Sequence, residues 1–257
     1  GGAEMATTAE LEGLYRQAKY REVIESADKN DPEQFLLVGW AYHQLGEYDK
    51  SKIFFAGLVS NYQSSSKIGE SARRGLAHSW LQTDGISPLV EGVMKEIPPS
   101  IDLDNVYMNA VLVKARKGET ISVELVIGRI IAALTTVPYK TVSGHIINNG
   151  VLTLHEARSQ EGVRPYLSIL PGLMDAAIGI YEATGTAENH IAGAEYRAAL
   201  ICRASGWKKL ALVSAQESVD LWRPLACSQG GERYQKNLEG AEKLLRELKE
   251  EGGISLI

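Results

Sequence analysis

Along most of the chain, apolar residues recur at intervals of three and four, which is the spacing of amphipathic α-helices. No segment shows a sustained alternation of apolar and polar residues bounded by hairpin turns, so no sheet is expected. The chain is therefore predicted to be all-α. The expected helices cover the region after Thr7, 21 to about 29, two segments within 35–58, a segment around 74–81, 87–97, 102–117, 122–134, 141–158, two pieces within 162–185, 187–205, 207 to about 227, and 232–250.

Capping residues indicate where several helices begin. Thr7 is followed three residues later by Glu10, which is the spacing of a capping box. Ser87 precedes Pro88, and this pair suits the cap and first turn of a helix. Gly118 and Gly206 separate neighbouring helical segments, so these segments are predicted to pair as antiparallel hairpins.

Prolines interrupt two of the later segments. Pro165 suits a helix start, whereas Pro171 and Gly172 are signals for a break, so two helical pieces are expected between residues 162 and 185. Pro224 lies near the end of the segment that begins at Trp207 and is a signal for an early stop.

The first hundred residues contain an internal repeat. The segment 35–58 reads FLLVGWAYHQLGEYDKSKIFFAGL, and a second copy begins around residues 74–81. Gly75 lies 36 residues after Gly39, and Leu81 lies 36 residues after Leu45. A partial copy precedes both. Two landmarks at one offset indicate stacked structural units of the same kind.

The repeated segment resembles a tetratricopeptide (TPR) unit. The residues that match the pattern of the family are Phe35, Val38, Gly39, Tyr42, Leu45, Gly46, Tyr48, Ser51, Phe55 and Leu58. The resemblance implies a right-handed superhelix of antiparallel helical hairpins, a TPR-like α-solenoid. It covers residues 6–97 as TPR-like repeats, and residues 98–251 are expected to continue the solenoid as divergent hairpins with a C-terminal capping helix. At Gly39 two helices are expected to cross closely.

In the TPR family the first helices of successive hairpins line a concave groove that binds partners. The resemblance therefore implies a set of groove-facing residues. These are Tyr15, Arg16, Leu36, Trp40, His43, Gln44, Ala72, Leu76, Ser79 and Trp80. Trp40 and Leu76, one repeat offset apart, should be neighbours. Exposed tryptophans are frequent binding hot spots, but Trp40 and Trp80 also suit an alternative role as packing bridges between repeats.

Composition narrows the range of partners. The chain has 27 Lys and Arg against 32 Asp and Glu, and the net charge of −5 argues against a nucleic-acid partner. Its most apolar window, 121–137, contains two charged residues and is too short to cross a bilayer, so membrane insertion is not expected. Cys202 and Cys227 fall in predicted helices and are expected to be core residues. The N-terminus lacks the features of a secretory signal, which favours the cytoplasm.

Catalytic chemistry is not indicated by the sequence. His155-Glu156 resembles the opening of a zinc-protease motif, but Ser159 stands where the second metal ligand would be. No phosphate loop, nucleophile elbow or dinucleotide fingerprint is present. We expect no enzymatic activity, no cofactor and no metal site. His78 is expected to be a hydrogen-bonded core residue.

His145, Asn148 and Asn149 share one predicted helix. Two interpretations stay open: these side chains present hydrogen bonds to a peptide backbone, or they form a polar face or helix end near Gly150.

The resemblance favours a non-enzymatic interaction module, an adaptor or assembly scaffold that holds a partner peptide or helix in its groove. The groove residues named above are aromatic and aliphatic rather than a set of Lys, Asn and Arg, so an apolar or helical ligand is expected. The alternative is a regulator that senses a short signalling peptide. The oligomeric state stays open. The apolar tail 254–257 is expected either to fray or to pack on the last hairpin or another chain.

Overall fold

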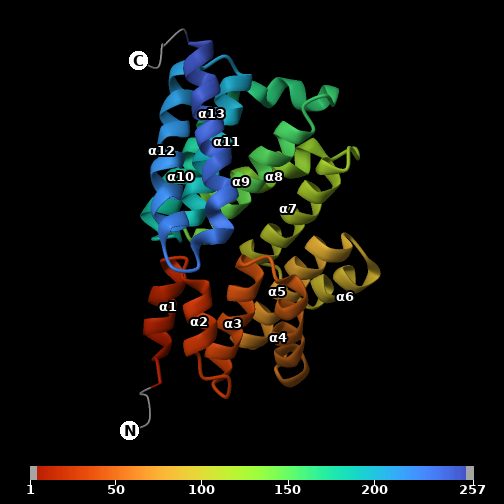
Figure 1. The fold of residues 1–257 in the computed structure, drawn as a ribbon. Coiled ribbons are helices and arrows are strands. Elements are labelled where there is room, and N and C mark those ends of the chain that lie inside the picture. Colours follow the sequence, from red (N-terminus) through yellow and green to blue (C-terminus); the bar gives the residue numbers. More distant parts are fainter. Residues whose placement is uncertain (1–4, 253–257) are drawn as a thin grey trace. The chain divides into compact units, whose positions relative to one another are not determined.

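The computed structural model describes residues 5–252, and within this range the predicted all-α fold is confirmed (Figure 1). The described residues form thirteen α-helices and two 3₁₀-helices, with no strand among them. Consecutive helices pack against each other from α1 to α6 and from α8 to α13. The chain divides into two compact units, one ending at Val113 and the other beginning at Lys114. Each unit is described by itself.

The first unit consists of three helical hairpins, and each helix from α1 to α5 packs against the next one. Alternate helices also touch, since α1 contacts α3 and α3 contacts α5. The helices are α1 (Thr8–Arg16), α2 (Tyr20–Ser26), α3 (Pro32–Gln44), α4 (Tyr48–Asn61), α5 (Lys67–Asp84) and α6 (Pro88–Glu96). Helix α7 (Ile101–Arg116) runs across the boundary between the units.

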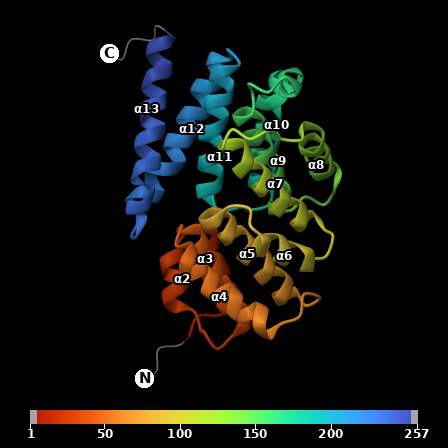
Figure 2. The ribbon, with the colours of Figure 1, turned by 90° about the vertical axis from the view of Figure 1, so that its right-hand side faces the viewer.

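The second unit continues the hairpin pattern with longer helices (Figure 2). Helix α11 packs along α12, and α13 packs against α12, while α9 and α13 each also touch α11. The elements are α8 (Val123–Thr135), α9 (Thr141–Glu156), η1 (Glu161–Ile169), α10 (Leu170–Ala183), α11 (Glu188–Ala204), α12 (Lys208–Cys227), η2 (Gly231–Tyr234) and α13 (Gln235–Glu251).

The predicted caps and turns are present. Thr7 and Glu10 form a reciprocal capping box, with the Glu10 amide donating to Thr7 Oγ1 at 3.2 Å and the Thr7 amide donating to Glu10 Oε2 at 2.9 Å. Ser87 caps α6 by accepting from the Val90 amide. Gly118 and Gly206 adopt the left-handed conformation, with φ of 75° and 77°. Local sequence therefore sets these boundaries.

Phe55 fills the crossing of α3, α4 and α5, and it is completely buried. Two glycines make room for its ring. A Cβ at Gly39 would lie 2.9 Å from Phe55 Cε1, and a Cβ at Gly75 would overlap the same ring. The prediction that helices cross closely at Gly39 is confirmed. Gly75, one repeat later, makes the corresponding approach from the other side.

The proline signals had two different outcomes. Residues 161–183 form two pieces as predicted, and Pro171 lies in the first turn of α10, where its missing amide costs nothing. Pro224 does not end its helix, because α12 continues to Cys227. Trp222 and Leu225, on either side of this proline, are buried, so packing holds the last turn in place.

The C-terminal region also differs from expectation in two details. Cys202 is buried as predicted, but Cys227 is exposed, because it is the last residue of α12 rather than an inward-facing one. The last helix begins at Gln235 after a 3₁₀ turn, not at Glu232. It has the amphipathic pattern of a cap, with one buried stripe formed by Leu238, Ala241, Leu244 and Leu248. The tail 254–257 lies outside the described residues.

Candidate functional site

The predicted partner-binding residues lie on α1, α3 and α5, the first helices of the three hairpins in the first unit. Their side chains differ in solvent exposure. Arg16 is exposed, whereas Ala72, Leu76 and Ser79 are buried. The others are partly buried: Tyr15, Leu36, Trp40, His43, Gln44 and Trp80.

Trp40 packs between α3 and its neighbours. Its ring meets Phe55 edge to face with centroids 5.0 Å apart, and its Nε1 donates a hydrogen bond to Ser71 Oγ on α5 at 3.2 Å. Trp40 and Leu76 belong to the same apolar cluster, which confirms that they are neighbours. The indole thus bridges adjacent hairpins while part of its surface stays accessible.

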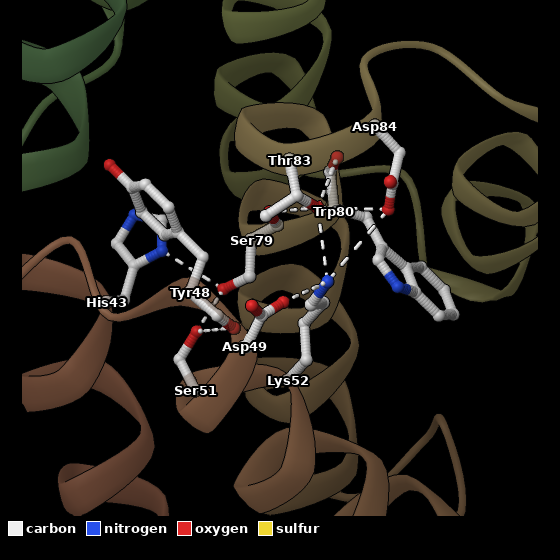
Figure 3. A network of polar contacts seen from close by, with 9 residues as sticks. All are labelled: His43, Tyr48, Asp49, Ser51, Lys52, Ser79, Trp80, Thr83 and Asp84. Carbon is white, nitrogen blue, oxygen red and sulfur yellow. Dashed lines mark hydrogen bonds and ion pairs between the residues drawn. The ribbon is translucent and has the colours of Figure 1, made fainter.

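His43 is held by a short chain of hydroxyl groups (Figure 3). Its Nδ1 is hydrogen-bonded to Ser79 Oγ at 3.1 Å, and Ser79 Oγ lies 2.7 Å from Ser51 Oγ. Ser51 in turn donates to the carbonyl oxygen of Tyr48 at 2.9 Å. Ser79 and Ser51 are completely buried, so Ser79 can orient His43 but offers little surface of its own.

The imidazole of His43 also lies beside Trp40, with ring centroids 5.7 Å apart at an interplanar angle of 80°. These two rings form the best-defined part of the predicted site. In Figure 3 the indole of Trp80 lies on the other side of Ser79 and Thr83 from His43. Trp80 packs against the apolar residues that α5 and α6 share, and it also borders the Phe55 cluster against which Trp40 packs.

The remaining predicted residues of the first unit have structural neighbours of their own. Tyr15 packs edge to face on Tyr20 of α2, with centroids 5.0 Å apart. Leu36 borders the Phe55 cluster. His78 is buried and hydrogen-bonded to Asn109 at 2.7 Å, which confirms the predicted core histidine.

In the second unit, His145 belongs to a buried aromatic group. Its Nδ1 is hydrogen-bonded to Tyr181 Oη at 2.8 Å, and its ring centroid lies 4.9 Å from that of His190. Gly144 allows the close approach, because a Cβ there would lie 2.5 Å from Tyr181 Cε1. Burial, reinforced by the positive charge of Arg197, lowers the pKa of His145 to about 4. Burial raises the pKa of Tyr181, so both groups are neutral at pH 7.

Asn148 and Asn149 lie within α9, which continues to Glu156, so they are not at a helix end. Asn148 is 5% exposed and donates to Asn149 Oδ1 at 3.2 Å. Its burial leaves it little access to a peptide backbone. His145 and Asn149 are partly buried.

Sequence reasoning missed a pocket of about 480 Å³ in the second unit. Helices α9, α11 and α13 form most of its wall, and α12 and the end of α7 complete it. Its lining consists of Arg116, Leu152, His155, Glu156, Gly193, Tyr196, Arg197, Leu200, Ile201, Trp222, Lys236, Asn237 and Gly240.

The α11 residues of this lining, between Gly193 and Ile201, follow the spacing of a single helix face. This spacing is visible in the sequence, but a helix face of this kind predicts core packing rather than a pocket wall.

Within residues 5–252, no group of three or more His, Cys, Asp or Glu side chains is placed to hold a metal ion. In the same range, no helix combines the length and the apolar character that crossing a bilayer requires.

Comparisons with known proteins yield little. No family model matches the chain, and no curated protein matches it. Among solved structures it is similar to a chain in the crystal structure of the APC/C hetero-tetramer Cut9-Hcn1, with 14% identity and a TM-score of 0.33. The match covers 94% of this chain and 48% of that chain, so the chain spans about half the length of its match. That TM-score supports no inference. The all-α hairpin architecture described above therefore rests on the chain's own structure.

Proposed function

We propose that this chain is a non-enzymatic protein interaction module, and that the α1, α3 and α5 face of its first unit binds a partner peptide or helix. The observation that carries the proposal is the ring pair of Trp40 and His43. Both side chains keep accessible surface, and both are held by hydrogen bonds to serines of α5.

Rigid aromatic surface is favourable for binding because little rotamer entropy remains to be lost when a partner docks. Trp40 offers apolar area, and its indole N–H is already satisfied by Ser71, so burial under a partner leaves no orphan donor. Leu36 and Gln44, on the same helix, extend the surface with one apolar and one polar side chain. This mixture suits an apolar or helical segment with a few polar groups.

The predicted residues divide into contact residues and supporting residues under this proposal. Trp40, His43, Gln44 and Leu36 retain surface for a partner. Ser79 and Leu76 are buried, so they support the ring pair and do not contact the partner themselves. Trp80, beyond Ser79, supports the junction of α5 and α6. Under this proposal, residues 6–97 carry the binding face.

The experiment pairs a change on this face with a matched change on α4. A partner recovered by affinity capture is titrated against the unaltered chain, against His43→Ala with Gln44→Ala, and against Ile53→Ala. Ile53 is 69% exposed, so its truncation removes surface side-chain atoms from α4 in the way that the double variant removes them from α3. We expect the double variant to bind at least about fivefold more weakly, which corresponds to a loss of about 1 kcal/mol. The Ile53 variant should bind like the unaltered chain.

Each variant is first checked for unchanged helicity and melting temperature. If the folded double variant binds normally while the Ile53 variant loses affinity, the binding face is on the second helices and the proposal is wrong. The alternative of a peptide-sensing regulator stays a prediction. It would be favoured by a short free peptide, rather than a protein, in the captured material.

A further inference from the structure

The pocket of the second unit differs from the first unit's face in its charge. Arg116, Arg197 and Lys236 line it with Glu156 as the sole acidic side chain of the lining. His155 adds no positive charge at pH 7, because burial and the nearby Arg158 lower its pKa. The lining therefore carries an excess of two positive charges, in a chain whose net charge is −5.

Arg197 is the central cation. Its guanidinium lies against α11 itself, with Nη1 3.2 Å from the position that a Cβ at Gly193 would take. Within residues 5–252, no carboxylate lies within ion-pair distance of Arg197 and no hydrogen bond from its guanidinium is found. Burial lowers the pKa of Arg197. The interaction with Tyr181 opposes this effect, and the positive charge of Arg116 adds to it.

Such an arrangement is unfavourable without a counter-charge beside it. A charge that loses hydration without gaining a partner raises the free energy of the folded state. A second like charge nearby adds to the cost. A bound anion would offset both effects, so the arrangement favours anionic ligands over neutral or cationic ones.

The remaining wall is apolar. Leu152, Leu200 and Ile201 contribute aliphatic surface, and Trp222 and Tyr196 contribute aromatic surface. Trp222 is 4% exposed, so its ring is a fixed part of the wall. The volume of about 480 Å³ is in the usual range for small-molecule sites, about 300 to 1,000 Å³.

We propose that this pocket binds a small organic oxyanion, with a carboxylate or phosphate on Arg197 and Arg116 and an apolar body against Trp222 and Leu200. The planar guanidinium fork of Arg197 suits the two oxygens of either headgroup. Lys236 and Asn237 provide further donors at the rim. This inference is independent of the function proposed for the first unit.

The test uses four probes and the full chain in isothermal titration calorimetry. The probes are 3-phenylpropionate, phenyl phosphate, the neutral 3-phenylpropionamide and inorganic phosphate. We expect at least one of the two aromatic anions to bind saturably with a Kd below about 1 mM. The one that binds more tightly identifies the headgroup. The neutral amide, which lacks the charge, and inorganic phosphate, which lacks the apolar body, should bind at least about tenfold more weakly.

Variants locate the binding. Arg197→Gln should weaken the preferred anion by about tenfold or more, and Arg197→Lys should give an intermediate loss because it keeps the charge without the fork. Arg246→Gln is the matched control, since Arg246 is an exposed arginine of α13 outside the pocket. It removes the same charge and should leave the affinity unchanged.

A spectroscopic readout is independent of the heat signal. The chain has five histidines, so the imidazole resonance of His155 can be assigned with a His155→Gln variant. An anion in the pocket should raise the pKa of His155, because the negative charge stabilises its protonated form. The proposal is overturned if neither aromatic anion binds, if the amide binds as well as the acid, or if folded Arg197→Gln retains full affinity.

Discussion

Arg73 and Arg197 occupy similar places in the two units, because each lies on the first helix of a hairpin, α5 and α11. Their surroundings are opposite. Arg73 is 8% exposed, and its Nε donates to Glu96 Oε2 at 2.7 Å. Its Nη1 donates to the carbonyl oxygens of Tyr62 and Gly69, each at 3.0 Å. Arg197 lines a pocket without any corresponding partner among the described residues.

The difference separates two uses of a cation that is wholly or partly removed from solvent. Arg73 donates to the carbonyl oxygens of Tyr62, before α5, and of Gly69, in the first turn of α5, so it acts as part of the fold. Arg197 satisfies nothing within the described chain, so its charge is available to a molecule from outside. The same contrast holds for packing: Phe55 fills the crossing in the first unit, whereas α9, α11 and α13 leave a pocket. The pocket leaves room for a ligand beside Arg197.

The largest effect is expected from one substitution made in both units. Gly75→Ala should destabilise by about 3 kcal/mol, because its Cβ would overlap the buried Phe55 ring. Gly193→Ala should change stability by less than about 1 kcal/mol, because the atom its Cβ meets is the movable end of Arg197 and alanine favours the helix. Urea denaturation midpoints measure both. Equal losses would show that the second unit is packed as tightly as the first.

Removal of each arginine's charge should give a smaller effect with different outcomes in the two units. Arg73→Met should cost about 2 kcal/mol, because two carbonyl groups lose their donor. Arg197→Met should be neutral or stabilising by up to about 1 kcal/mol, since an unpaired, partly buried charge is replaced by an apolar side chain. Thermal melts in low salt test this. A large loss for Arg197→Met would mean that Arg197 has a structural partner.

Acid should weaken the second unit through His145. The pKa of His145 is about 4 in the folded protein against 6.5 in the unfolded chain, so unfolding takes up a proton between these values. Stability contributed by neutral His145 is present above pH 6.5 and is lost as the pH falls toward 4, by on the order of 2 kcal/mol. His145→Gln should flatten this part of the pH profile. An unchanged slope would exclude His145 as its cause.

Glu195 should give the smallest effect on stability, and its pH dependence should be opposite in sign to that of His145. Burial raises its pKa to about 7, and the charges of Glu217, Glu182 and Asp175 add to this, although a hydrogen bond from Ser214 opposes it. The unfolded chain releases this proton at lower pH, near 4.5, so stability decreases as pH rises from 4.5 to 7.

Glu195→Gln should therefore raise the urea midpoint slightly at pH 8 and leave it unchanged at pH 4. A matched Glu217→Gln variant, at a carboxylate exposed on α12, is the comparison. If Glu195→Gln lowers the midpoint at pH 8, its carboxylate is ionised and paired in the folded state.

The sequence by itself determined the helices, their caps and the first repeat. Thr7 with Glu10 and Ser87 with Pro88 act within one helical turn, so their effect can be read without a structure. The repeat offset placed Gly39 at a crossing and Trp40 beside Leu76, because equivalent positions of stacked hairpins become neighbours.

Tertiary structure decided which side chains are available. Ser79 was predicted to face a partner, but it is buried beneath His43 because α4 supplies Ser51 on its other side. Cys227 was predicted to be core, but its helix ends there in an exposed position. The pocket around Arg197 depends on residues from Arg116 to Gly240 that meet only after folding. Whether an arginine has a carboxylate beside it is a property of these long-range contacts, and no local pattern encodes it.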